Sequence, residues 1–382
     1  MGFWEAVLAE FKAILSDRAI AITLFGGVVF YALLYPLPYL NQVPVEQQLV
    51  VVDKDHSSLS RQLIRHADAS PKLAVVAQVD NIEQARVMIA KERAHGFIVI
   101  PEGFRRDLLR RQSVTLAYGG DANYFLIYST IIEGLVAVGM ESEKSVRTIG
   151  LLANGQSPKQ VARDVAPIHL NSVPAFNPGL GYTAYVVPGV LLLVLHQTLL
   201  IGTGILGAGQ WRKQGYWRQL TIGRLLAARL VTFGLIYSLF TSFYFGICYY
   251  AYDVNTQAEL GQLALFLLPF ILATSLAGVA ISCLFTRRDQ PTQIMLLLSM
   301  PILFLSGFIW PLELIPMPLI WLSDLIPAVP GIQGILQLNQ MGADWSAIAP
   351  LWLQLWGLAL GYLLLALLGM RWRLGQIHQY EH

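Results

Sequence analysis

Six long apolar runs constrain this chain more than any other feature of its sequence. An α-helix rises 1.5 Å per residue, so about 20 uncharged apolar residues cross a hydrocarbon layer about 30 Å thick. Runs of this kind lie at residues 20–40, 184–206, 230–252, 263–285, 292–311 and 351–370. We therefore expect six transmembrane helices. The first run is long and no small-residue cleavage site follows it closely, so we expect it to remain as an anchor.

The composition agrees with a membrane protein. Only 13% of the residues are charged and 55% are hydrophobic, which is too apolar for a soluble enzyme. The net charge of +2 provides no concentrated basic surface, so we expect no nucleic-acid partner. Both cysteines, Cys248 and Cys283, lie inside apolar runs, which favours neither a disulfide framework nor a thiolate metal site.

The distribution of cations predicts the orientation of the spans. Lys and Arg stay on the cytoplasmic side of short loops. With both termini in the cytoplasm, all eleven cations outside residues 41–183 fall on that side: Lys12, Arg18, Arg212, Lys213, Arg218, Arg224, Arg229, Arg287, Arg288, Arg371 and Arg373. The opposite short loops carry only acids: Asp253, Glu259, Glu313, Asp324 and Asp344. We expect a multi-pass protein of a bacterial inner membrane.

Residues 41–183 have a different character and predict an α/β domain outside the cytoplasm. Compact β-rich runs predict strands at 47–53, 72–79, 95–101 and 113–118. Capping residues and helical patterns predict helices at 57–67, 80–94 and 124–152, with Asp80 as a cap of the second. This alternation is typical of a small layered α/β unit.

Two loops of this domain carry possible ligand donors. "DKDHSS" contains Asp53, Asp55 and His56, and "GGDANY" contains Asp121. Neither loop has a complete metal-ligand spacing, so solvated loops with helix caps are the favoured interpretation.

The sequence contains no familiar catalytic motif. It has no G-x-x-x-x-G-K-[ST] phosphate loop, no H-E-x-x-H and no G-x-S-x-G. "GTGILGAG" at 202–209 ends an apolar span, which favours close helix packing over a nucleotide loop. We expect no enzyme activity, no bound cofactor and no metal. An enzyme embedded in the membrane would need charged groups within the spans, and these are nearly absent.

Two cytoplasmic segments are candidates for contact with other molecules. Residues 1–19 place apolar side chains at helical spacing, with Glu5, Glu10, Lys12 and Asp17 largely opposite, which predicts a helix in the membrane interface. The loop at 207–229 begins "GAGQWRKQGYW" and is basic and aromatic. It either attracts anionic lipid or docks a cytoplasmic protein.

One span contains polar residues near its middle. His196 and Gln197 interrupt "VLLLVLHQTLLIG" at 190–202. Polar groups in hydrocarbon need partners, so we expect the pair to face protein or a cavity and not lipid. The pair either forms a hydrogen bond with a neighbouring span or lies on a substrate path.

The chain resembles the permease subunits of type-2 ABC exporters, specifically those with a large α/β domain between spans one and two. "VVVDKDHSSLSRQL", "GFIVIPEGF" and the segment 304–345, opening "FLSGFIWPLE", carry the resemblance. It implies a membrane α-helical fold with re-entrant helices at 312–350 before the last span and a cytoplasmic coupling loop at 207–229. Where this family usually has "E-x-E-x-G-T" after span two, this chain has "GAGQWRKQGYW".

The resemblance also implies a function. The chain would export hydrophobic or amphipathic molecules, such as drug-like compounds or lipids, powered by ATP that separate cytoplasmic ATPase subunits hydrolyse. It would pair with a second permease subunit, identical or homologous, and a periplasmic adaptor could join them. The coupling loop would present Trp211, Arg212, Lys213, Tyr216, Trp217 and Arg218 to the ATPase. The alternative is a receptor or sensor that transports nothing and whose outer domain binds a ligand.

The predicted topology can be tested by cysteine accessibility. After Cys248 and Cys283 are replaced, single cysteines at Ser57, Gln214 and Gln379 are exposed to an impermeant thiol reagent in sealed cells. We expect labelling only at position 57. Labelling of Gln214→Cys in sealed cells would contradict the topology.

Overall fold

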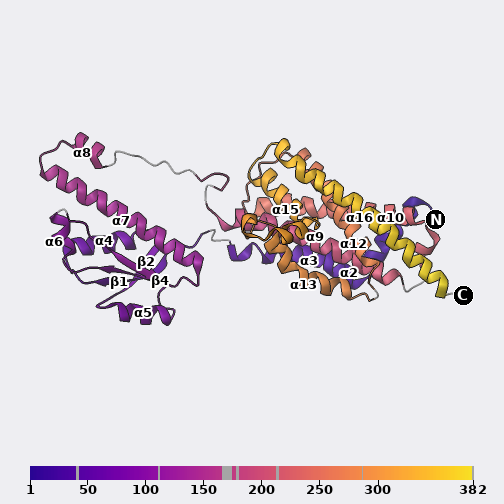
Figure 1. Ribbon diagram of the computed structural model, residues 1–382, viewed down its shortest axis with the longest axis horizontal. Helices are drawn as coiled ribbons and strands as arrows, with labels where there is room; N and C mark the ends of the chain where they lie inside the picture. The colour runs from indigo at the N-terminus through magenta and orange to yellow at the C-terminus, as the bar shows by residue number, and fades with distance from the viewer. Residues whose placement is uncertain are drawn as a thin grey trace. The chain divides into compact units, whose positions relative to one another are not determined.

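The computed structural model describes residues 1–39, 43–110, 112–165, 174–177, 180–211, 215–285 and 287–380. The chain divides into two compact units, a helical unit formed by Met1–Gln42 with Pro174–His382, and an inserted unit, Val43–Val173. Figure 1 labels their helices and strands.

The helical unit is built almost entirely from helices. Its N-terminal part contains α1 (Phe3–Ser16), α2 (Arg18–Ala21), the π-helix η1 (Ile22–Gly26), α3 (Gly27–Leu34) and the 3₁₀-helix η2 (Leu37–Tyr39). The rest contains α9 (Tyr182–Gln210), η3 (Tyr216–Gln219), α10 (Ile222–Ser242), η4 (Phe243–Cys248), α11 (Tyr249–Ala251), α12 (Leu260–Ser282), α13 (Gln290–Leu305), η5 (Leu312–Leu314), α14 (Met317–Ser323), α15 (Ala328–Ile335), η6 (Leu336–Gln340) and α16 (Trp345–Tyr380).

Five of the six predicted spans are long apolar helices. Helices long and apolar enough to cross a membrane cover Arg18–Tyr39, Tyr182–Gln210, Ile222–Ala251, Leu260–Ser282 and Trp345–Gln376. The remaining one, predicted at 292–311, is α13, which has only 16 residues. It ends early because the chain turns at Gly307, whose φ of +85° is a left-handed conformation that favours glycine.

A bent pair of helices follows α13, in the segment where re-entrant helices were predicted. Met317–Ser323 and Ala328–Gln340 meet at an angle of 91° across a short break. Such a pair is either a broken span or a re-entrant loop. Its assignment as re-entrant helices therefore stays a prediction.

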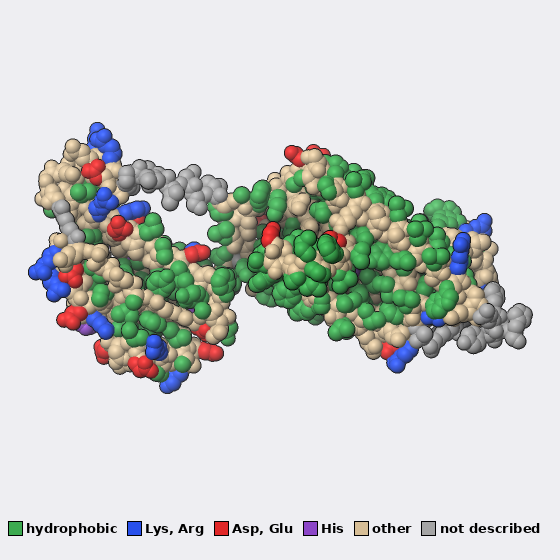
Figure 2. Space-filling view, viewed as in Figure 1, with side chains coloured by type: hydrophobic (Ala, Val, Ile, Leu, Met, Phe, Trp, Pro, Cys, Tyr) green, Lys and Arg blue, Asp and Glu red, His purple; other side chains and the backbone are tan. Residues whose placement is uncertain are grey.

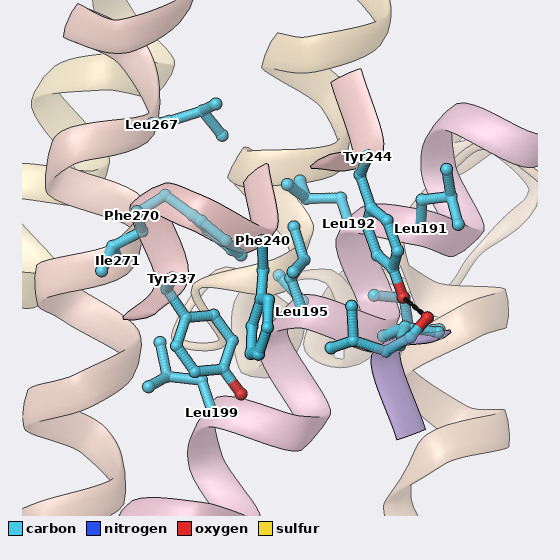
Figure 3. Close-up of a cluster of buried hydrophobic side chains, with 14 of the residues drawn as sticks. Leu191, Leu192, Leu195, Leu199, Tyr237, Phe240, Tyr244, Leu267, Phe270 and Ile271 are labelled. Atoms are coloured by element: carbon cyan, nitrogen blue, oxygen red, sulfur yellow. Dashed lines mark hydrogen bonds between the residues drawn. The ribbon is translucent and has the colours of Figure 1, made fainter. Parts of the chain in front are cut away.

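Helix α9 forms the centre of the helical unit. In its most apolar 18-residue window, 83% of the residues are buried inside the protein. Figure 3 shows leucines of α9 packed among Tyr237 and Phe240 of α10 and Phe270 of α12. A span surrounded by other spans is shielded from lipid, so its side chains serve packing or function and not contact with lipid.

Glycines allow α9 and α12 to approach closely. A β-carbon at position 278 would lie 1.8 Å from Thr203 Oγ1, and one at position 207 would lie 2.2 Å from Ser282 Oγ. The "GTGILGAG" segment thus contributes to close helix packing, as expected from the sequence.

Cations of the helical unit gather at one of its ends. On the face shown in Figure 2 the surface is mostly apolar, and Lys and Arg gather at the end where Figure 1 places both termini. The exposed cations in the described residues include Lys12, Arg18, Arg218, Arg287, Arg288 and Arg371. The sorting of charge read from the sequence is therefore present in space, although the side of the membrane that each end faces stays a prediction.

The inserted unit is a three-layer α/β arrangement around a four-stranded sheet of order β2-β1-β3-β4. The strands are β1 (Gln47–Asp53), β2 (Leu73–Val79), β3 (Gly96–Ile100) and β4 (Ala117–Gly120). β1 pairs in parallel with β2 and β3, whereas β4 is antiparallel to β3. The helices are α4 (Ser58–Asp68), α5 (Ile82–Ala90), α6 (Phe104–Leu109), α7 (Phe125–Ala153) and α8 (Pro158–Val165).

The central strand β1 is buried on both faces. Leu49 and Val51 pack with α4 and α7, while Val50 and Val52 pack with α5 on the other face (Figure 1). Alternate side chains of a strand point to opposite faces, so a strand covered on both sides reads as the continuous apolar run "QLVVVD".

Several details of this unit differ from the sequence-based expectation. β4 covers 117–120 and not 113–118, and α6 and α8 were not predicted. Asn81, not Asp80, caps α5, because its side chain accepts from the backbone N–H of Gln84. α7 also has the length and hydropathy of a membrane span, yet its residues Ile131 and Leu135 pack in the core beneath the sheet.

The close approach of α9 and α12 gives a stability prediction. We expect Gly278→Ala to lower the melting temperature of the purified protein by several degrees, since overpacking costs about 1–3 kcal/mol. Gly234→Ala is the matched control, because apart from its chain neighbours and the backbone of its own helix, nothing in the described structure lies within 4 Å of its added β-carbon. Replacing a helical glycine by alanine there should leave stability equal or slightly higher. Equal melting temperatures for the wild type and Gly278→Ala would refute the packing argument.

Candidate functional site

The N-terminal helix buries an acidic residue against α10. Ala6, Val7 and Ile14 of α1 are buried, and so is Glu10, whose side chain has no exposed surface. The expectation that Glu10 lies opposite the apolar face was wrong. Residues three or four positions apart share one side of a helix, so Glu10 lies on the same side as Val7 and Ile14.

Glu10 forms a fully buried ion pair with Arg229 of α10. Arg229 Nε donates to Glu10 Oε2 at 3.0 Å, and Arg229 Nη2 donates to Glu10 Oε1 at 2.9 Å. Both side chains are 0% exposed. This two-point geometry matches the planar guanidinium to the carboxylate, and it joins two helices that are about 220 residues apart in the chain.

Two further side chains complete a polar node, which we define as Glu10, Gln210, Tyr216 and Arg229. Tyr216 of η3 donates to Glu10 Oε1 at 2.8 Å. Gln210, the last residue of α9, donates from Nε2 to the Tyr216 hydroxyl at 2.8 Å and accepts from Arg229 Nη2. The polar node therefore joins α1, the end of α9, the loop after it, and α10.

The electrostatics of the polar node favour a neutral, protonated Tyr216 and a positively charged Arg229. Burial, and after it the negative charge of Glu10, raises the pKa of the Tyr216 hydroxyl well above its ordinary value. Tyr216 therefore keeps its proton and can donate it to Glu10. The Arg229 guanidinium also lies near the C-terminal end of α9, where the helix dipole favours a cation.

One donor of the polar node is left over. Arg229 Nη1 is buried and has no hydrogen-bond partner within the described residues. It lies 3.8 Å from the position that a β-carbon of Gly207 would take. The node is thus tightly connected but not fully satisfied.

The predicted coupling residues occupy different environments. Trp211 and Trp217 are 7% and 3% exposed and pack edge to face at 5.8 Å. Trp211 Nε1 also donates to the Ser282 carbonyl at 3.2 Å. Both tryptophans thus anchor the loop within the chain. Arg212 and Lys213 lie outside the described residues.

The remaining two predicted coupling residues differ in exposure. Arg218 is exposed, with its guanidinium 5.3 Å from the centre of the Trp217 ring. Tyr216 is half-buried in the polar node. Of the described part of this set, Arg218 is the side chain presented most fully at the surface.

The polar pair of α9 points into the protein. His196 is 0% exposed and its ring centre lies 6.5 Å from that of Phe270. Neither ring nitrogen of His196 has a hydrogen-bond partner among the residues with described placement. Gln197 is half-buried. His196 therefore faces protein, as expected, but the hydrogen bond to a neighbouring span is not formed.

The two loops of the inserted unit have structural roles. Asp53 Oδ1 accepts from the backbone N–H groups of Asp55 and His56, and Asp53 Oδ2 accepts from Ser60 Oγ at 2.7 Å. Asp121 accepts from the N–H of Asn123. Across the described ranges no group of three or more His, Cys, Asp or Glu side chains could hold a metal ion.

Sequence reasoning missed most of the polar node. From the sequence alone, Arg229 is one of eleven cytoplasmic cations, Gln210 is part of the loop at 207–229, and Glu10 lies largely opposite the apolar face of the N-terminal helix. The signal was present: Glu10 stands at helical spacing within an apolar stripe, and Arg229 adjoins an apolar run. A charge next to a buried surface requires a partner, but the sequence does not say which one.

Comparison with known proteins agrees with this architecture. Residues 18–368 match the family model described as "ABC-2 family transporter protein". The chain is 23% identical over 338 residues to "Probable multidrug ABC transporter permease YbhR" of Escherichia coli strain K12, with 84% of each chain covered. The protein of the same name from Escherichia coli O157:H7 gives the same values.

The family match covers most of the chain, and the structure has the several long apolar helices of a multi-pass membrane transport protein. The chain therefore belongs to the ABC-2 family, as a membrane permease of ABC transporters.

Proposed function

We propose that this chain is the permease subunit of an ATP-driven exporter, powered by a separate cytoplasmic ATPase. The observation that carries the proposal is the polar node. This chain belongs to a transporter family and has no phosphate loop of its own. The polar node ties the loop after α9 to α1 and to α10, at the end of the helical unit where exposed cations gather. A partner that pushes on this loop would move two spans.

The proposed arrangement places both termini and the loop at 207–229 in the cytoplasm, and the inserted unit outside it. The sorting of cations and acids between the two ends of the helical unit supports this topology. ATP would bind to the partner ATPase subunits, and this chain itself would bind no cofactor. A second permease subunit, identical or homologous, would complete the transporter, and a periplasmic adaptor is a further proposed partner.

The proposed substrates are hydrophobic or amphipathic molecules, either drug-like compounds or lipids. The relative named as a multidrug permease supports this class. His196 and Gln197 are the proposed contacts on the substrate path, because a buried ring without hydrogen-bond partners among the described residues retains its capacity for a ligand.

The proposed function is tested by reconstitution with the ABC ATPase encoded nearest to this chain. Rhodamine 6G, a hydrophobic cationic dye, is added on the ATPase side of sealed vesicles. We expect ATP-dependent movement of the dye to the opposite side, and this movement should require both proteins. A receptor would leave the dye in place. ATP hydrolysis without any dye or lipid movement would contradict the proposal.

In the same assay, the triple variant Arg212→Gln, Lys213→Gln, Arg218→Gln should retain membrane insertion but lose most of the transport. These cations are proposed to dock the ATPase, and attraction to lipid alone predicts no such loss. The control is Arg105→Gln with Arg110→Gln, two exposed cations of the inserted unit. If cross-links from positions 212–218 never reach the ATPase, the docking role fails.

His196 gives a separate prediction on substrate selection. His196→Leu removes two buried polar nitrogens that have no hydrogen-bond partner among the described residues. We therefore expect the melting temperature to stay equal or to rise, with a free energy of unfolding higher by up to about 1–3 kcal/mol. The rate for rhodamine 6G relative to NBD-phosphatidylcholine should change several-fold. Leu195→Met is the control, since it conserves volume on the same helix. Unchanged rates for both probes would remove His196 from the path.

A further inference from the structure

We propose that the Glu10–Arg229 pair is a mechanical link that transmits movement of the loop after α9 to the first and third spans together. This inference rests on the proposed function, because it concerns how ATP hydrolysis in a partner reaches the membrane. It assigns positioning roles to two residues of the polar node that the sequence did not single out.

Helix α10 and the N-terminal helices form one body. At the base of α10, Thr232 Oγ1 donates to the Val7 carbonyl at 3.3 Å, in addition to the Glu10–Arg229 pair. Further along, the Phe25 and Phe240 rings pack edge to face at 5.3 Å.

The attachment continues to the far end of the third span. Tyr244 of η4 donates to the Val28 carbonyl at 2.8 Å, the dashed bond in Figure 3. Tyr252, just after α11, donates to the Ala32 carbonyl at 2.9 Å. Contacts therefore join the first span to the third along most of its length.

Another group of helices is joined by hydrogen bonds at the same end of the helical unit. Trp211, directly after α9, bonds to the last residue of α12 through the Ser282 carbonyl. Arg373 of α16 donates from Nη2 to the Phe285 carbonyl, just beyond α12, at 3.2 Å. The ends of α9, α12 and α16 thus form a second group at this end of the unit, while along its length α9 also bonds to α10, where Tyr237 donates to Thr198 Oγ1 at 2.8 Å.

The loop after α9 runs from the second group of helices to the first body. The polar node lies where the two meet. Gln210 belongs to α9, whereas Glu10 and Arg229 belong to the first body. Tyr216 of the loop donates directly to Glu10. A displacement of the loop therefore acts on Glu10, and Glu10 acts on Arg229 and α10.

Stability alone does not account for the Glu10–Arg229 pair. Desolvation of two charges offsets most of their attraction, and well-packed apolar replacements of buried ion pairs are often as stable. Arg229 Nη1 is moreover left without a partner in the described part of the chain. A link between moving parts is a reason to retain such a pair.

The test replaces both charges by apolar residues of similar size, Glu10→Leu with Arg229→Met, in the full chain reconstituted with its ATPase. Gln210 and Tyr216 can still bond to each other in this variant. We expect wild-type folding, ATPase binding and basal ATP hydrolysis. The number of rhodamine 6G molecules moved per ATP should fall about tenfold, which is within the range of fold-changes that ordinary coupling free energies produce.

The control removes an ion pair elsewhere, Lys72→Gln with Glu133→Gln in the inserted unit, and should keep the wild-type ratio of dye to ATP. Should the double variant fold poorly, Tyr216→Phe provides the second test, because it removes the bond from the loop to Glu10 and keeps the pair. It should lower the same ratio.

The outcomes separate the link from the exporter. A well-folded double variant with the wild-type ratio, or an unchanged ratio in Tyr216→Phe, overturns the link while the exporter proposal stands. If the wild type moves no dye or lipid at all, the proposed function itself has failed.

Discussion

The burial of Arg229 is the main constraint on the end of the helical unit that we propose to face the cytoplasm. A guanidinium without exposed surface requires a carboxylate at hydrogen-bonding distance, and Glu10 supplies it at 2.9 and 3.0 Å. The pair that satisfies this charge joins α1 to α10, beside the apolar contacts of Ala6 and Val7 with Ala228. It also draws in Gln210 and Tyr216, and so fixes the path of the loop between the second and third spans.

The rest of the helical unit follows from the lack of water in hydrocarbon. Backbone polar groups must be satisfied within each helix, so the spans pack through side-chain shape and small residues. Glycines at 207 and 278 bring α12 against α9, and aromatic residues of α10 and η4 fill the side toward the first span. His196 is the exception on α9, since its ring nitrogens stay without partners in the described structure.

The inserted unit is organised differently, because its apolar core lies between the sheet and the helices that cover each of its two faces. Alternation along β1 divides the core between α4 with α7 on one face and α5 on the other. α7 shows that hydropathy alone does not define a span. It passes the same test of length and composition as the membrane helices, yet it packs on the sheet through residues such as Ile131.

The sequence by itself determined most of the elements, although not α6, α8 or the bounds of β4. Spans, strands and loops follow from local properties: the length of apolar runs, alternation, caps and the sorting of charge. It also identified His196 as a buried residue, since a lone polar group in a span must turn from lipid. It did not determine the fifth span, which is cut short by the left-handed turn at Gly307.

Only the tertiary structure decided which distant residues meet. The basic, aromatic loop looked like one exposed surface, yet Trp211 and Trp217 are core residues and Tyr216 bonds to Glu10. The partners Glu10 and Arg229 are 219 positions apart. Periodicity ranks residues within one helix, whereas a buried ion pair depends on how two helices pack, and no local pattern encodes that.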